Sequence, residues 1–202
     1  MTDEGVAYIA IGDKAERELT YSCASLHRYN PDLPFTVYSV PKVGTEFPVA
    51  LSRIAKLTLF EWCPYRRVLY LDADTRVFGD VSAGFQILRD GWDMVIAPSS
   101  NQGQDILWHV GAIDREITFR ALGTSEVLQL QAGVFFVNRN PRVQHFFDVW
   151  YNEWQRFKDQ DQAALLRALG QAPLKIWLLG RAWNDQRRGK KAVIEHWFGR
   201  AR

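Results

Sequence analysis

The chain has 202 residues, of which 47% are hydrophobic and 24% charged, with 14 Gly and 8 Pro. These values are typical of one folded domain and exclude a disordered, collagen-like or low-complexity chain. The formal net charge is +2, but residues 181–202 carry seven basic side chains against two acidic ones, so that this segment is +5 and residues 1–180 are −3. A basic strip of this kind suits a nucleic acid, a membrane surface or a phosphorylated ligand.

Cysteine content and apolar runs indicate the compartment. Cys23 and Cys63 are too few for a disulfide scaffold or a Cys-based zinc site. The first apolar run, residues 6–11, is far shorter than a signal-sequence core or a membrane span. We therefore expect a cytoplasmic protein with no transmembrane segment.

Hydrophobic patterning over the first half of the chain predicts alternating strands and helices. This order favours an α/β fold with a mixed, mostly parallel sheet and helices on both faces, in which ligands bind at the carboxyl ends of the strands. In chain order we expect a strand at 6–11, a helix at 14–29, a strand at 35–40, a helix at 49–62, a strand at 67–71, a helix at 81–88 and a strand at 93–97.

The second half begins with a long polar segment, residues 98–128, which is weakly periodic and too long for a plain connection. Segments of this kind are often functional loops. No internal repeat or linker interrupts the chain, so we expect residues 1–202 to form a single domain. The elements expected after this segment are a strand at 128–138, helices at 141–157 and 159–169, and strands at 174–179 and 192–197.

The sharpest chemical feature is Asp72-Ala73-Asp74, at the end of the apolar strand 67–71. In extended backbone, residues two apart point to the same side, so the two carboxylates are expected to converge. Two close carboxylates repel each other unless a cation lies between them, and Mg²⁺ or Mn²⁺ prefers oxygen ligands. A purely structural role, in helix capping or solvation of the strand end, stays open as an alternative.

Four histidines could add a ligand to this pair. His27 and His145 lie on predicted helices, and His109 in the polar segment has no evident partner. His196 ends the last predicted strand and is followed by a glycine and arginines. These could offer one metal ligand, one close backbone approach and a cation for a phosphate oxygen.

Four motifs together resemble glycosyltransferase family 8, and its glycogenin-like branch above all. Residues 55–75 are similar to the metal-binding region of that family, and residues 132–138 (AGVFFVN) to its Asn-Ala/Ser-Gly-Val strand. Asp161-Gln162 resembles its Asp-Gln helix start, and His196-x-x-Gly199-x-x-Arg202 its closing His-x-x-Gly-x-x-Lys motif. Each motif is weak alone, but the four follow the family order over nearly the whole chain. The resemblance implies a single GT-A-type nucleotide-diphospho-sugar transferase domain, a retaining and metal-dependent glycosyltransferase.

The resemblance also implies roles for individual residues. Asp72, Asp74 and His196 would bind Mn²⁺ or Mg²⁺, which would hold the diphosphate of a UDP-sugar donor. Asp161 and Gln162 would lie beside the anomeric carbon, and the acceptor, whether sugar, lipid or protein, would bind near residues 98–128. The other implied donor contacts are Ile9, Ala10, Ile11 and Gly12 under the base, Lys56, Ala73, Gly133 beside the sugar, and Gly199 and Arg202 near the diphosphate.

The chain departs from the family pattern at three points. Gln131 stands where the family has an Asn that hydrogen-bonds the sugar, and Arg202 replaces the Lys of the closing motif. Asp159-Gln160 offers a second register for the Asp-Gln motif. We prefer 161/162 because the apolar residues that follow then match the family.

Two other functions are compatible with part of this sequence. An aspartate-nucleophile phosphohydrolase also begins with an apolar strand and Asp-x-Asp, although Thr75-Arg76 after the second Asp fits that class poorly. A catalytically silent sugar-nucleotide binder would keep all the motifs. Nucleic-acid binding is disfavoured because no recognition motif accompanies the basic cluster at 187–191, whereas peripheral membrane contact through residues 181–202 stays open.

Tryptophan is abundant, with eight residues. Aromatic side chains fill cores or stack on sugars and bases. Five tryptophans fit predicted packing positions, namely Trp62, Trp92, Trp150, Trp154 and Trp177. Three are candidates for stacking at a site, namely Trp108, Trp183 and Trp197.

Overall fold

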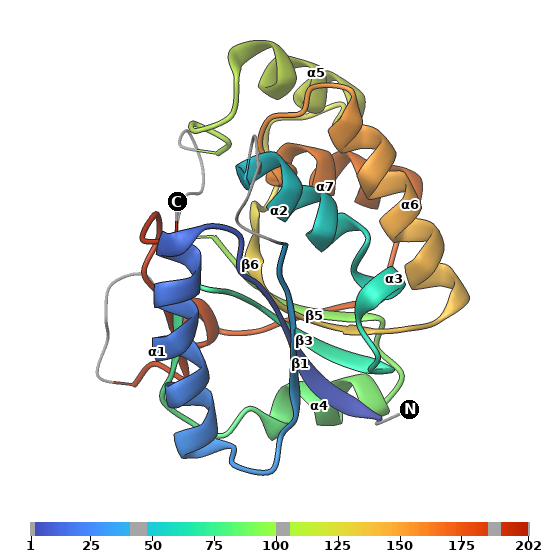
Figure 1. Ribbon diagram of the computed structural model, residues 1–202. Helices are drawn as coiled ribbons and strands as arrows, with labels where there is room; N and C mark the ends of the chain where they lie inside the picture. The colour runs from blue at the N-terminus through green and yellow to red at the C-terminus, as the bar shows by residue number, and fades with distance from the viewer. Residues whose placement is uncertain (1–2, 41–47, 100–105, 186–190, 202) are drawn as a thin grey trace.

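The computed structural model describes residues 3–40, 48–99, 106–185 and 191–201 (Figure 1). Arg202 and the basic cluster at 187–191, apart from Lys191, lie outside the described residues. Within the described chain no helix is long and apolar enough to cross a membrane.

A six-stranded sheet forms the centre of the molecule, with the strand order β2-β1-β3-β6-β5-β7. Five strands run in the same direction, and β6 alone is antiparallel to both of its neighbours. The predicted mixed, mostly parallel sheet is therefore confirmed. The strands are β1 (Glu4–Ile9), β2 (Phe35–Tyr38), β3 (Arg67–Asp72), β5 (Met94–Pro98), β6 (Leu130–Asn138) and β7 (Ile176–Leu178).

Helices cover both faces of the sheet because successive side chains of each buried strand enter opposite cores. In β3, Val68 and Tyr70 belong to one core, and Leu69 and Leu71 to the other. The first core is covered by α2 (Pro48–Leu57), α3 (Leu59–Trp62), α6 (Pro141–Gln155) and α7 (Asp161–Gln171), and the second by α1 (Asp13–Tyr29) and α4 (Ser82–Arg89), as Figure 1 shows.

A small second sheet, absent from the sequence-based prediction, pairs β4 (Thr75–Val77) with the last strand, β8 (Ile194–His196). The two strands are antiparallel, with Thr75 opposite His196. The short helix η2 (Arg181–Asn184) precedes β8. This pairing brings the end of the chain to the end of β3.

The segment between β5 and β6 begins and ends at the same end of the sheet, because Pro98 at the end of β5 pairs with Leu130 at the start of β6. The carboxyl ends of β1 and β3 lie at this same end of the sheet. The segment, for which the sequence predicts a functional loop, contains the helix α5 (Ala112–Leu122). Its periodicity is weak because its buried positions are polar rather than apolar: Asp114 and Thr118 contact the buried Arg167 of α7.

A predicted helix at 49–62 is interrupted at Thr58, whose backbone (φ −105, ψ 30) separates α2 from α3. The other predicted elements are present, with ends that differ by a few residues, as is normal for helix and strand termini.

Candidate functional site

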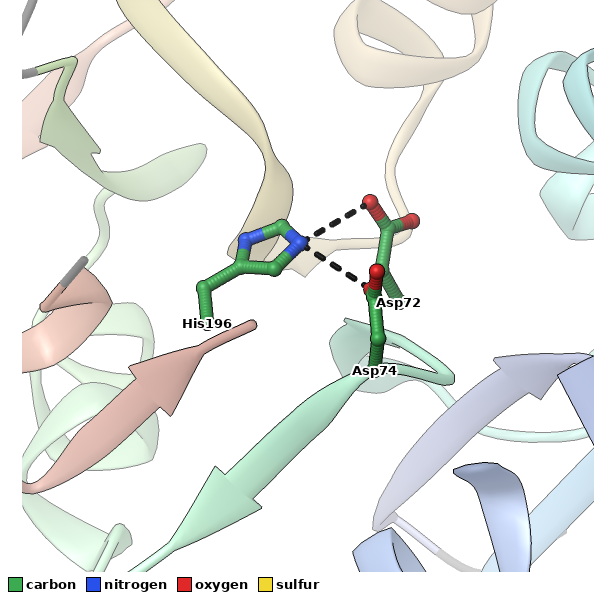
Figure 2. A group of neighbouring side chains, drawn as sticks. All are labelled: Asp72, Asp74 and His196. Atoms are coloured by element: carbon green, nitrogen blue, oxygen red, sulfur yellow. Dashed lines mark ion pairs between the residues drawn. The ribbon is translucent and has the colours of Figure 1, made fainter. Parts of the chain in front are cut away.

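Asp72, Asp74 and His196 meet at the carboxyl end of β3 (Figure 2). One ligand atom from each residue lies within 4.8 Å of the others. His196 Nε2 is 3.2 Å from Asp74 Oδ1 and 3.5 Å from Asp72 Oδ2. Asp74 lies in the turn between β3 and β4 rather than in extended backbone, so the turn, not strand alternation, makes the two carboxylates converge. The pairing of β4 with β8 then brings His196 to them.

The imidazole of His196 is held on several sides and is only 3% exposed. Its Nδ1 lies 3.1 Å from Asn184 Oδ1, an amide oxygen that can accept a hydrogen bond from the ring. The ring of Phe198 stacks on the imidazole at a centroid distance of 3.7 Å. Nε2 therefore faces the two carboxylates: protonated, it hydrogen-bonds them, and after losing that proton it offers the lone pair that can bind a metal.

Asp74 is 5% exposed and is an ionised carboxylate at neutral pH. Burial raises its pKa, but the hydrogen bond to His196 and the charge of that residue outweigh burial and leave the pKa below its usual value. The backbone N–H of Ala201 points to Asp74 Oδ2 at 3.5 Å, and that of Trp197 donates to the Asp74 carbonyl at 2.8 Å. The chain after β8 is thus attached to the carboxylate turn.

Gly133 of β6 makes room for this cluster. A Cβ atom at this position would lie 2.2 Å from His196 Cε1 and 2.5 Å from Asp72 Oδ2. Both distances are far below van der Waals contact, so any other residue would displace the two side chains. The glycine predicted to admit a donor sugar is therefore required by the Asp-His cluster itself.

A buried ion pair extends the cluster toward α7. Lys56 Nζ lies 2.9 Å from Asp161 Oδ2 and 3.3 Å from Asp72 Oδ1. Burial lowers the pKa of Lys56, but the two carboxylates outweigh it and raise this pKa above its usual value. Burial likewise raises the pKa of Asp161, and Lys56 outweighs it, so that the pKa of Asp161 is lowered. Both groups are charged at neutral pH, and the Tyr70 hydroxyl adds a 2.8 Å hydrogen bond to Asp72 Oδ1.

The amide of Gln162 is held at both ends. Its Nε2 donates to Gln131 Oε1 at 2.8 Å, and its Oε1 is hydrogen-bonded to His109 Nε2. Sequence reasoning left His109 without a partner, and the departure at Gln131 had no explanation. The structure shows that these two residues fix the orientation of the Gln162 amide together.

These groups line one cleft of about 680 Å³, which is within the usual range for small-molecule sites. Its floor is the end of the sheet where β1 and β3 end and β6 begins, the end at which the sequence predicts a ligand site. The predicted residues that line it are Ile9, Ile11, Gly12, Lys56, Asp72, Ala73, Asp74, Gly133, Asp161, Gln162, His196 and Gly199.

Two other predicted positions, Ala10 and Asp159, do not line the cleft, and a third is not described. Ala10, which follows the last residue of β1, is not among the residues that line the cleft and belongs to a small buried cluster with Ala15 and Ala73. Arg202 lies outside the described residues. In the alternative Asp159-Gln160 register, Asp159 instead accepts a 2.8 Å hydrogen bond from the backbone N–H of Gly111, just before α5.

Arg53 also lines the cleft and was not predicted. It donates to Gln160 Oε1 at 2.8 Å. A signal was present in the sequence, because Arg53 precedes Lys56 by three residues on a predicted helix, and such residues share a face.

The structure changes the assignment of two tryptophans, Trp183 and Trp177, between core and surface positions. Trp108 lines the cleft and is 62% exposed, as expected of a stacking candidate. Trp183 packs against Phe136 in a core, which corrects its assignment to the site. Trp177 is 44% exposed on the edge strand β7, where it contacts Trp92, so it is not a core residue.

The donor set fits a divalent metal ion. Carboxylate oxygens suit Mg²⁺ and Mn²⁺, and an imidazole nitrogen suits several divalent first-row ions. Three features favour a bound cation: His196 directs Nε2 toward the carboxylates, Asp74 is ionised, and the missing side chain at Gly133 leaves room for the cluster. Without one, the two carboxylates would repel each other at this distance.

No protein-family model matches the sequence, and no curated protein is similar to it in sequence. Solved structures do match. Mouse xyloside xylosyltransferase 1 has a TM-score of 0.63 and 11% identity, covering 100% of this chain and 99% of that chain. The galactosyltransferase LgtC, solved with donor and acceptor sugar analogs, has a TM-score of 0.62 and 15% identity, covering 96% and 87%.

A third match is the glycosyltransferase GlyE of Streptococcus pneumoniae, with a TM-score of 0.63 and 15% identity. That match covers 97% of this chain but only 54% of the GlyE chain. At these identities the similarity establishes the fold, which is the GT-A type of glycosyltransferases.

Proposed function

We propose that the protein is a metal-dependent glycosyltransferase of the family 8 type, which transfers a sugar from a nucleotide-diphosphate donor, a UDP-sugar, to an acceptor. The observation that carries the proposal is the Asp72-Asp74-His196 cluster at the floor of a cleft of about 680 Å³. The GT-A fold and the order of the four sequence motifs support it.

Asp72, Asp74 and His196 would hold the ion, Mn²⁺ or Mg²⁺. A bound divalent cation supplies Lewis-acid stabilisation of the negative charge that develops on the leaving diphosphate. The residues around it prepare the site: Lys56 and Tyr70 orient the Asp72 carboxylate through Oδ1. That leaves Asp72 Oδ2, together with Asp74 Oδ1, on the side of His196 Nε2.

The nucleotide base would lie against Ile9, Ile11 and Gly12, which line the cleft beside the cluster. Gly12 has a φ of +94, a backbone conformation that favours glycine, at the start of α1. This turn presents backbone rather than side chain to the cleft.

Asp161 and Gln162 would face the anomeric carbon of the donor sugar. Asp161 is kept ionised by Lys56, and the Gln162 amide is fixed by His109 and Gln131. A fixed carboxylate and a fixed amide oxygen on one side of the sugar would stabilise positive charge at that carbon as the leaving group departs. This arrangement is consistent with transfer that retains the anomeric configuration.

The acceptor would bind where Trp108 is exposed at the rim of the cleft. Trp108 belongs to the segment between β5 and β6, which lies at the same end of the sheet as the metal cluster. An exposed indole offers a flat apolar face for a sugar ring.

The proposal is tested by screening nucleotide sugars with and without Mn²⁺ for thermal stabilisation and for release of free nucleotide. We expect stabilisation and nucleotide release that both require the metal, and loss of both in Asp74→Asn. Asp32→Asn, which makes the same charge change at an exposed position, is the matched control. If no nucleotide sugar stabilises the wild type, or if Asp74→Asn responds equally, the proposal fails.

The same screen, extended to simple phosphate esters with release of inorganic phosphate as the readout, separates the alternative functions. A catalytically silent sugar-nucleotide binder would be stabilised by the donor and the metal but would release no nucleotide. An aspartate-nucleophile phosphohydrolase would release inorganic phosphate from phosphate esters without any sugar nucleotide.

A further inference from the structure

A second hollow, of about 620 Å³, adjoins the metal cleft and shares Lys14 and Gly199 with it. It lies between the N-terminal half of α1, the strand β4 and the chain that follows β8. The residues that line it are Lys14, Arg17, Glu18, Tyr21, Arg76, Trp197, Gly199 and Arg200. Of its eight lining residues, four are cationic and one is acidic, an unusual excess of positive charge for a hollow in a chain of net charge +2.

The side chains at the floor of this pocket are held in place by several contacts. Arg76 is only 8% exposed and forms an ion pair with Glu18. Its guanidinium carbon lies 5.2 Å from the centroid of the Tyr21 ring and 5.0 Å from that of Trp197. The Trp197 indole is itself held by a 2.8 Å hydrogen bond from Nε1 to Glu195 Oε2. Cation–π contacts and the ion pair therefore fix the guanidinium plane of Arg76.

Three further cations lie around this floor. Lys14, Arg17 and Arg200 are exposed, and within the described chain no carboxylate lies at ion-pair distance from any of them. Arg200 is also ordered, because its guanidinium carbon lies 4.1 Å from the centroid of the Trp197 ring. Since Glu18 neutralises only Arg76, the pocket has a net charge of +3.

We propose that this second pocket binds a phosphate monoester group, separate from the diphosphate of the donor. Guanidinium groups match phosphate oxygens in pairs, and a site of net charge +3 suits a dianion. The volume exceeds what a bare ion needs and admits the body of a small phosphorylated molecule. The phosphate belongs either to a phosphorylated sugar or to a lipid headgroup. The inference does not rest on the proposed transferase activity, because it concerns binding alone.

The test is calorimetric titration of the full chain with inorganic phosphate and with glucose 6-phosphate, in the presence of a chelator so that the Asp-His cluster holds no metal. Uncharged glucose is the negative probe. We expect saturable binding of both phosphates, about tenfold weaker in Arg17→Gln and in Arg200→Gln because each removes a charge-assisted contact. Co-sedimentation with phosphatidylcholine vesicles, with and without phosphatidic acid, tells a lipid phosphate from a soluble one.

Arg28→Gln is the matched control, since it removes an exposed arginine from the far end of the same helix. Its phosphate affinity should equal that of the wild type. Absence of binding by every phosphate probe would overturn the proposal, as would an equal loss in Arg28→Gln. Binding that is lost in Arg53→Gln, in the metal cleft, but kept in Arg17→Gln would also overturn it.

Discussion

His196 Nδ1 lies 3.1 Å from Asn184 Oδ1, and this contact decides which nitrogen of the imidazole faces the two carboxylates. Asn184 is buried at the end of η2, and His196 ends β8, the strand that pairs with β4. A metal-binding imidazole is generally oriented by such a partner on its other nitrogen.

Asn184→Ala is expected to weaken Mn²⁺ binding by about 10- to 100-fold, because His196 loses the acceptor that orients its ring. Mn²⁺ titration followed by electron paramagnetic resonance measures this directly. Asn152→Ala, at an exposed position on α6, should bind as the wild type does. Equal affinities in the two variants would contradict a positioning role for Asn184.

Gly133→Ala is expected to weaken metal binding by more than tenfold and to cost about 1–3 kcal/mol of unfolding free energy, as overpacking does. The new Cβ would lie 2.2 Å from His196 Cε1 and 2.5 Å from Asp72 Oδ2, so both ligands must move. Gly180→Ala is the control, because no described atom lies within 4 Å of its Cβ position. Urea unfolding and Mn²⁺ titration of both variants give the comparison, and undiminished metal affinity in Gly133→Ala would refute the prediction.

His109→Phe should lower turnover by about 10- to 100-fold while leaving donor affinity near the wild-type value. The substitution keeps a ring but removes the Nε2 contact to Gln162, whose amide can then turn away from the donor. Steady-state kinetics with the donor found in the screen would separate the two effects. His145→Phe, on the exposed side of α6, should have no effect on either. A change in donor affinity alone would argue against positioning of Gln162.

Asp161→Asn is expected to destabilise the protein by about 1–3 kcal/mol at neutral pH, because buried Lys56 loses its nearest carboxylate. The pKa of Asp161 in the folded state is below its usual 3.8. Its stabilisation is therefore complete above the pKa of the unfolded chain and is lost as the pH falls through the folded value.

Urea unfolding of the wild type and Asp161→Asn at pH 7 and near pH 3 provides the measurement, with Asp32→Asn as the exposed control. The difference in unfolding free energy between the wild type and Asp161→Asn should be smaller near pH 3 than at pH 7. A difference that stays constant with pH would mean that the charge of Asp161 does not stabilise the fold.

The sequence alone determined the layers of the fold and the position of the two carboxylates of the site, Asp72 and Asp74. Apolar runs such as residues 68–71 predict buried strands because burial on both faces of a sheet leaves a local pattern. The position of Asp72 and Asp74 followed directly, since both come immediately after such a run. The stripe on α6, including Trp150 and Trp154, was equally evident from helical spacing.

Only the tertiary structure decided which distant residues complete the site. The resemblance points to His196 as a third ligand, but how it reaches Asp72 is visible only in the fold: β4 pairs with β8, and the pairing of two three-residue strands leaves no periodic signal in the sequence. The helix α5 escaped prediction because Arg167 buries it through ion pairs and hydrogen bonds rather than apolar contacts. His109 and Gln131 take their roles from Gln162, which is remote from both along the chain. The spacing of apolar residues along the sequence indicates which residues are buried. Which residues they contact depends on the tertiary structure.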